Sequence, residues 1–291
     1  MVTSTQHPLG NSLLSDLYLR RRGFAIAGHV AGGNVGTVLL TPAAALLIVA
    51  WGWRRTVLLL TLPAILAGIA ILAGIREVRA PLPDRSALRD MLAGLGRLRR
   101  SRNLALIFAA SLVAAGGRGL SVVILVVPLY LKRQLQLHDP YATVLYTLLL
   151  LGSVAGPLVA GRISDRLGRR RILLLAYALS ALATLLFLRA PVQGPWLALS
   201  LLAMGLVVYA ESPLLQAFLA DEAPLRERDA LFSLYFAVAF GIGALWAAGI
   251  GALLDTIGYA PVFGIIAGSC LAAAALTLAI RETRSAPAMG R

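Results

Sequence analysis

Long apolar blocks alternate with short arginine-rich segments along the whole chain. A transmembrane helix needs roughly 20 consecutive apolar residues to cross about 30 Å of hydrocarbon, and blocks of this kind recur in the sequence. They predict eight spans. The predicted spans are Phe24–Ala50, Thr56–Ile75, Leu104–Leu131, Tyr141–Arg162, Ile172–Leu188, Pro195–Leu219, Ala230–Leu254 and Tyr259–Ile280. The first 22 residues are too short and polar for a ninth span, and they lack the apolar stretch of a signal peptide.

Composition agrees with a membrane protein. Of 291 residues, 59% are hydrophobic and 14% are charged, and a soluble domain of this length needs more polar residues to cover its surface. We therefore predict an all-α fold, a polytopic bundle of transmembrane helices. Cys270 is the single cysteine, so the sequence predicts neither an internal disulfide nor a cysteine-based metal site. The three histidines share no metal-ligand spacing with carboxylates, and no phosphate-binding glycine loop is present. We expect no metal, no cofactor and no enzymatic activity.

The basic residues predict the orientation. With eight spans, both termini share one side of the membrane, and 21 of the 27 lysines and arginines fall on that side. Five fall on the other side, and Arg118 lies within a span. The positive-inside rule then places both termini in the cytoplasm of a cell membrane. The same distribution accounts for the net charge of +14, so we expect the lipid bilayer as a partner and no nucleic acid.

A weak parallel repeat relates residues 6–75 to residues 211–280. In each copy an aspartate stands eight residues after a proline, at Asp16 and at Asp221, and an arginine-rich turn follows. Gly52 and Gly258 then take equivalent places. Such repeats are typical of two-lobed transporters, but the first copy lacks about a hundred residues that precede the second.

This repeat predicts the domain organisation. Residues 1–75 are interpreted as the remainder of an N-terminal half, beginning with the stump of a helix. Residues 76–103 form a cytoplasmic linker, whose rear has the leucine spacing of a helix lying on the membrane surface. Residues 104–281 form a complete six-helix C-terminal half, and residues 282–291 form a cytoplasmic tail.

The strongest short motif runs from Gly161 to Arg171, with the sequence GRISDRLGRRR. A glycine here lets neighbouring helix ends approach, and an aspartate can accept hydrogen bonds from arginines and from a helix N-terminus. The motif resembles the cytoplasmic loop signature of the major facilitator superfamily. The resemblance implies a conformational latch between helices. Its predicted residues are Gly161, Asp165, Arg166, Gly168 and Arg169. The alternative interpretation is that the motif is only a basic loop, without a role as a latch.

The resemblance also implies a fold and a function. Members of this family have two six-helix halves, and the spans of this chain resemble helices five to twelve of twelve. The implied function is secondary active transport of a small molecule, as a permease or efflux protein, by alternating access and with proton coupling. The rival hypothesis is a non-transporting, truncated membrane remnant, or a membrane interaction protein that needs a partner chain. Under either hypothesis, self-association or a missing N-terminal portion would complete the bundle.

Two charges deep in predicted spans are candidates for the transport site. A charge at the bilayer centre costs roughly 2.5–3.5 kcal/mol on insertion scales, so Arg118 and Glu211 need a reason to be there. We predict that they lie at similar depths, face the central cavity and interact. Glu211 would accept a proton, and Arg118 would be its partner or would contact an anionic substrate. The alternative is a static pair that holds two helices together.

Other polar residues in spans are weaker candidates. His29, Asn34, Tyr209 and Gln216 are predicted to line the cavity, with interhelical packing as the alternative for each. Three glycines, Gly28, Gly32 and Gly36, recur every four residues and predict a face against which another helix packs closely.

Overall fold

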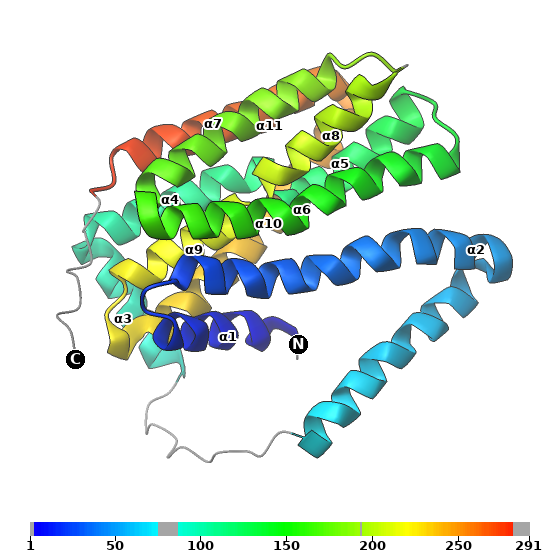
Figure 1. Cartoon of the computed structure of the whole chain (residues 1–291). Helices are drawn as coiled ribbons and strands as arrows, with labels where there is room; N and C mark the ends of the chain where they lie inside the picture. Colours follow the sequence, from blue (N-terminus) through cyan, green and yellow to red (C-terminus); the bar gives the residue numbers. More distant parts are fainter. Residues whose placement is uncertain (1–2, 75–86, 193, 282–291) are drawn as a thin grey trace.

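The structure, a computed structural model, describes residues 3–74, 87–192 and 194–281 as helices joined by short turns, without a strand in these ranges (Figure 1). The helices are α1 (Thr3–Leu17), α2 (Arg22–Gly74), α3 (Ala87–Arg100), α4 (Arg102–Ala114), α5 (Ile124–Leu129), α6 (Asp139–Leu167), α7 (Arg169–Leu188), α8 (Pro195–Val208), α9 (Glu211–Glu222), α10 (Arg228–Ile257) and α11 (Tyr259–Leu278). Short helical turns are η1 (Ala115–Gly117), η2 (Gly119–Val123), η3 (Tyr130–Gln134) and η4 (Leu225–Glu227). The predicted all-α fold is confirmed.

Membrane-spanning helices make up most of the described chain. Seven helical stretches within it are long and apolar enough to cross a bilayer, where the sequence predicted eight spans. The difference arises in α2, which joins two predicted spans into one helix of 53 residues. At about 1.5 Å per residue, its length is about twice the thickness of the membrane. The expected turn over residues 51–55 is therefore a bend at one residue, Gly52.

The bend in α2 has a counterpart between α10 and α11. Gly52 has φ 76° and Gly258 has φ 78°, a conformation that glycine adopts without steric cost. These glycines occupy equivalent places in the sequence repeat. Their surroundings differ, because α11 folds back onto α4 and α7 while the arm of α2 after Gly52 leaves the bundle (Figure 1). Apolar side chains along this arm are exposed, as at Leu72, which is 85% exposed.

Helices α4 to α11 enclose the apolar core. One cluster of buried side chains centres on Tyr177, Phe218 and Tyr235, and a second includes Phe187 and Phe263. Helices α6 and α8 approach each other closely, because Gly156 leaves no side chain between its own backbone and that of Leu206. Inside lipid no hydrophobic driving force holds helices together. Small residues at such crossings let the backbones approach, and the helices then associate through close van der Waals packing.

Two of the spans are interrupted next to each other. Helix α4 gives way to η1 and then to Arg118, whose backbone is extended (φ −70°, ψ 133°) before η2 begins. The span formed by α8 and α9 is interrupted at Tyr209 and Ala210. Gly119 lies against the ring of Tyr209, since a Cβ there would come within 2.8 Å of it. Interrupted helices inside a membrane are typical of transporter binding sites.

The amphipathic helix expected in the linker is present as α3. Its Arg97 donates two hydrogen bonds, of 2.7 and 2.6 Å, to the carboxylate of Glu227 in the turn before α10. These hydrogen bonds lower the pKa of Glu227, so the carboxylate stays ionised and holds α3 against α10. Residues 75–86 of the predicted linker and the predicted tail at 282–291 lie outside the described residues.

We predict that Gly156→Ala destabilises the chain, because the new methyl group would overlap the backbone of Leu206, which cannot move aside as a side chain would. Overpacking of this kind costs about 1–3 kcal/mol. The midpoint of thermal unfolding in detergent should fall. Gly36→Ala is the matched control, because no atom lies within 4 Å of its Cβ position and alanine favours a helix over glycine. Equal midpoints for both variants would contradict the packing described for α6 and α8.

Candidate functional site

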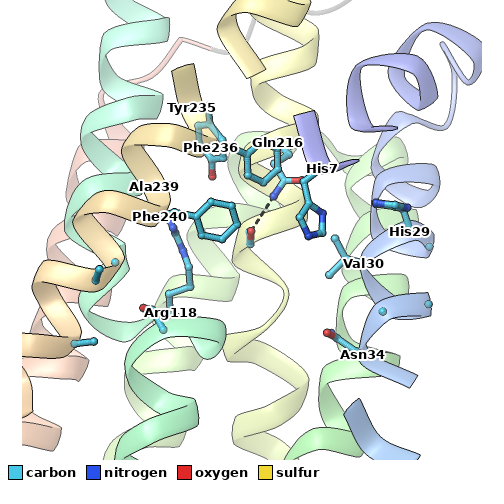
Figure 2. Close-up of a pocket in the computed structure, with 18 residues that line it drawn as sticks. His7, His29, Val30, Asn34, Arg118, Gln216, Tyr235, Phe236, Ala239 and Phe240 are labelled. Atoms are coloured by element: carbon cyan, nitrogen blue, oxygen red, sulfur yellow. Dashed lines mark hydrogen bonds between the residues drawn. The ribbon is translucent and has the colours of Figure 1, made fainter. Parts of the chain in front are cut away.

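A cavity of about 830 Å³ lies between α1 and α2 on one side and α9, α10 and the interrupted span at Arg118 on the other (Figure 2). Polar and aromatic side chains share its wall. They include His7, His29, Asn34, Arg118, Ser121, Gln216, Tyr235, Phe236 and Phe240. The volume is within the range of small-molecule binding sites.

Arg118 and Glu211 form the buried ion pair that the sequence predicted. Arg118 Nε donates a 2.8 Å hydrogen bond to Glu211 Oε1, and Arg118 Nη2 donates to the carbonyl and the hydroxyl of Ser111 at 3.0 and 2.9 Å. The interruption after η1 places the arginine here, and its carbonyl oxygen accepts the N–H groups of Ser121, Val122 and Val123. The Arg118 carbonyl thus pairs three backbone N–H groups that the interruption would otherwise leave free inside the membrane.

The two charges do not both face the cavity. Arg118 is on its wall, whereas Glu211 is 3% exposed and lies behind the arginine, at the start of α9. Among the described residues, Glu211 Oε2 has no hydrogen-bond partner. Tyr209 also lies off the cavity, because its ring fills the space beside Gly119. Arg118 thus stands between the cavity and the buried carboxylate.

The other predicted site residues line the cavity. Asn34 donates a 2.8 Å hydrogen bond to the Ser153 carbonyl and so ties α2 to α6. Gln216 accepts a hydrogen bond from Asn11 at 2.6 Å and donates one to Ser212 at 2.9 Å. His29 contributes its ring to the wall, and its Nε2 has no hydrogen-bond partner among the described residues.

His7 is a cavity residue that sequence reasoning missed. Its ring stacks on Phe236 at 5.6 Å between centroids and meets the His29 ring edge-on at 5.7 Å (Figure 2). The repeat could have predicted this position. It aligns Pro8, which follows His7, with Pro213, which lies three residues before Gln216. No described helix packs on the predicted glycine strip of α2, since no atom of the described chain lies within 4 Å of a Cβ at Gly28, Gly32 or Gly36.

The latch motif joins α6 to the beginning of α2. Asp165 accepts hydrogen bonds from the N–H groups of Gly23 and Phe24 at 3.0 and 2.9 Å, and Arg169 pairs with the same carboxylate at 2.6 Å. A Cβ at Gly161 would lie 2.5 Å from the Gly23 carbonyl oxygen, so only glycine permits this approach. Negative charge at a helix N-terminus is favourable.

The remaining latch residues have different roles. Gly168 has φ 99° and forms the turn between α6 and α7. Arg169 reaches across to Asp221 at 2.9 Å, whereas Arg166 lines a separate small pocket at the same end of the bundle. We call this end, which carries the α1–α2 turn and the α6–α7 turn, the basic end.

Two ion pairs at the basic end follow the repeat in a reciprocal way. Arg22 at the start of α2 pairs with Asp221 at 2.9 Å. Arg228 at the start of α10 pairs with Asp16 in the last turn of α1. Each copy of the repeat thus supplies an aspartate to the arginine of the other copy. The repeat marked both aspartates and the arginine-rich turns that follow them, but it did not predict these pairs.

The helical spans, the interrupted helices and the buried charges define a multi-pass membrane protein of the transporter class. The sequence model of the Major Facilitator Superfamily matches residues 1–120 and 107–290. The chain belongs to this superfamily.

Individual relatives are similar in part. The probable 4-methylmuconolactone transporter of Cupriavidus pinatubonensis is 26% identical over 93% of this chain and 63% of its own length. A D-xylose transporter of Levilactobacillus brevis is 32% identical over 37% of this chain and 23% of its own length. The chain thus spans less than two thirds of the curated relatives it matches.

A solved structure has a similar fold. The crystal structure of a bacterial homologue of the iron transporter ferroportin, in an outward-facing state, matches with a TM-score of 0.56 and 16% identity. The match covers 93% of this chain and 66% of that chain. At this identity the likeness concerns the fold alone.

We predict that Glu211→Ala is strongly destabilising, because it leaves the Arg118 guanidinium buried without its counter-ion. Removing one partner of a buried pair costs about 3–5 kcal/mol. Glu211→Gln should cost less, since its amide oxygen can still accept from Arg118 Nε. Thermal unfolding of both variants in detergent measures the difference. Equal losses would show that the charge of Glu211 does not stabilise Arg118.

Proposed function

We propose that this chain forms the larger part of a proton-coupled secondary transporter for small organic anions. It would work in a cell membrane with both termini in the cytoplasm, and no enzymatic step is involved. The observation that supports this function is the position of Arg118, on the wall of the cavity and in contact with a buried carboxylate.

Arg118 has donors left for a ligand. Its Nε and Nη2 are engaged by Glu211 and Ser111, and Nη1 has no hydrogen-bond partner among the described residues. The N–H groups of Nη1 carry part of the guanidinium charge, so in a cavity of low polarity a carboxylate oxygen is a favourable partner for them. Phe236 and Phe240 line the same cavity and suit the apolar body of an organic acid.

Proton binding and anion binding would be linked through this arginine. While Glu211 is ionised, it neutralises Arg118. Protonation of Glu211 removes that charge and leaves Arg118 in need of another anion, because an unpaired buried charge is costly. A substrate carboxylate in the cavity would then bind more tightly, and deprotonation would release it. Proton and anion are therefore expected to move together.

The latch would govern access to the cavity. In this structure Asp165, Asp221 and their arginine partners hold α2, α6, α7 and α9 together at the basic end. If the basic end is cytoplasmic, as its arginines favour, the cavity is closed toward the cytoplasm. Opening it would require these pairs to separate, which is the alternating-access step.

A second candidate function follows from the uncovered face of α2. In the described chain no atom lies within 4 Å of a Cβ at Gly28, Gly32 or Gly36, and most apolar side chains of the arm after Gly52 are exposed. We expect the chain to correspond to helices five to twelve of the family's twelve. Further helices would complete the N-terminal half, supplied by a longer polypeptide, a partner chain or a second copy. Without them, the chain would be an interaction protein that does not transport.

The test is uptake into proteoliposomes with an imposed pH gradient. A panel should contain lactone carboxylates, simple organic acids and D-xylose as a neutral comparison. The 291-residue chain should be assayed alone and also joined to any additional N-terminal helices that its gene encodes. We expect uptake of at least one organic acid that depends on the proton gradient. Uptake of D-xylose alone would contradict the anion site.

We predict that Glu211→Gln abolishes gradient-driven uptake but retains exchange of labelled for unlabelled substrate, since glutamine mimics the protonated acid. Arg118→Gln should abolish both. Asp255→Asn is the matched control, because this carboxylate lies near the end of α10 and is exposed. Unchanged proton dependence in Glu211→Gln would exclude Glu211 as the coupling residue.

Topology can be tested separately. In a Cys270→Ala background, cysteines replacing Arg100 and Arg170 should be protected from a membrane-impermeant thiol reagent in intact cells. A cysteine replacing Arg189 should react. Labelling of the cysteines at positions 100 and 170 from opposite sides of the membrane would contradict the proposed orientation.

A further inference from the structure

A second, smaller pocket of about 230 Å³ lies at the basic end, outside the cavity described above. Its walls come from two elements. Arg20, Arg21 and Phe24 belong to the α1–α2 turn and the start of α2, and Arg162, Asp165 and Arg166 belong to α6. The pocket therefore bridges the contact that the latch motif makes between α2 and α6.

The four arginines of this pocket have no carboxylate partner among the described residues. The pocket's own carboxylate, Asp165, is already engaged by Arg169 and by the N–H groups of Gly23 and Phe24. The nearby aspartates also pair elsewhere, Asp221 with Arg22 and Arg169, and Asp16 with Arg228. Four like charges thus surround one small space, an arrangement that an anion would stabilise.

Phosphate is the anion that fits this set of donors best. Guanidinium groups bind phosphate oxygens in a bidentate way, and Arg162 and Arg166 stand four residues apart, on one face of α6. Exposed apolar side chains lie close in sequence to the pocket residues, and one of them, Phe24, lines the pocket itself. They are Leu17, Leu19, Phe24, Ile163 and Leu167. A soluble phosphate would leave these side chains in water, whereas the acyl chains of a lipid would cover them.

We propose that this pocket binds the phosphodiester headgroup of an anionic phospholipid. Basic pockets between transmembrane helices are suited to such headgroups. The bound phosphate would lie between the α1–α2 turn and α6, and it would relieve the repulsion between their arginines. It would thereby strengthen the contact between Asp165 and the start of α2, which holds the basic end closed. This proposal does not depend on the transported substrate.

The test measures lipid binding to the whole chain, purified in neutral detergent. Native mass spectrometry should detect retained phosphatidylglycerol in preference to phosphatidylcholine. The double variant Arg162→Gln/Arg166→Gln should lower the apparent affinity for phosphatidylglycerol about thirtyfold, at about fivefold for each arginine near the headgroup. The control, Arg54→Gln/Arg55→Gln, removes two exposed arginines from the opposite end of the bundle and should bind like the unmodified chain.

A second readout concerns the latch itself. In lipid nanodiscs, phosphatidylglycerol should slow hydrogen exchange of a peptide containing Gly23 and Phe24, whose N–H groups bind Asp165. The effect should disappear in the α6 double variant. If that variant does not fold, Arg20→Gln/Arg21→Gln tests the opposite wall of the pocket in the same way.

Three outcomes would overturn the proposal. The first is equal retention of phosphatidylglycerol by the pocket variants and the unmodified chain. The second is protection of Gly23 and Phe24 by inorganic phosphate or pyrophosphate but not by phosphatidylglycerol, which would assign the pocket to a soluble phosphate. The third is an equal loss of bound phosphatidylglycerol in the Arg54→Gln/Arg55→Gln control, which would show that lipid binding depends on the net charge of the chain and not on the pocket.

Discussion

A polar group inside hydrocarbon has no water to bind, so every charge and every broken helical turn there needs a partner within the protein. This constraint explains how the centre of the bundle is built. The span that begins with α4 is interrupted at Arg118, and its carbonyl oxygen accepts the N–H groups of the next turn. The guanidinium is held by Glu211 and Ser111. Because one side of Arg118 meets the cavity, the residue whose carbonyl oxygen pairs the interrupted turn is also the one proposed to contact a ligand.

The basic end follows the same principle with a different geometry. There the charges are partly accessible to water, and the pairs cross between the two copies of the repeat: Arg22 with Asp221, and Arg228 with Asp16. Single ion pairs near water contribute little, but these share partners with Arg169 and with the Asp165 contact to the start of α2. Because the pairs share partners, separating one of them also removes a partner from the next. Such behaviour suits a device that must open and close.

Much of the fold followed from the sequence, because crossing a bilayer imposes a length and an apolar composition that are visible in the residues. The Arg118–Glu211 contact was also predictable, since two opposite charges buried in spans must find each other. The sequence could not predict which of the two charges faces the cavity. That depends on the interruption at η1, which Gly116 and Gly117 permit but do not require. The pairing of Asp16 with Arg228 and the position of His7 also arise from helix packing, which no local pattern encodes.

The two anion sites proposed for this chain differ in what already engages their arginines. At Arg118 a ligand would share the guanidinium with Glu211 and Ser111, so its binding would change with the protonation of one carboxylate. At the basic end the four arginines have no carboxylate partner among the described residues, and Asp165, which lines the same pocket, is engaged by Arg169 and by the start of α2. An anion there would add to the stability of the latch without displacing an existing ion pair. Conditional binding at the centre and constant binding at the end would allow a transporter to release its substrate without losing the anion at its basic end.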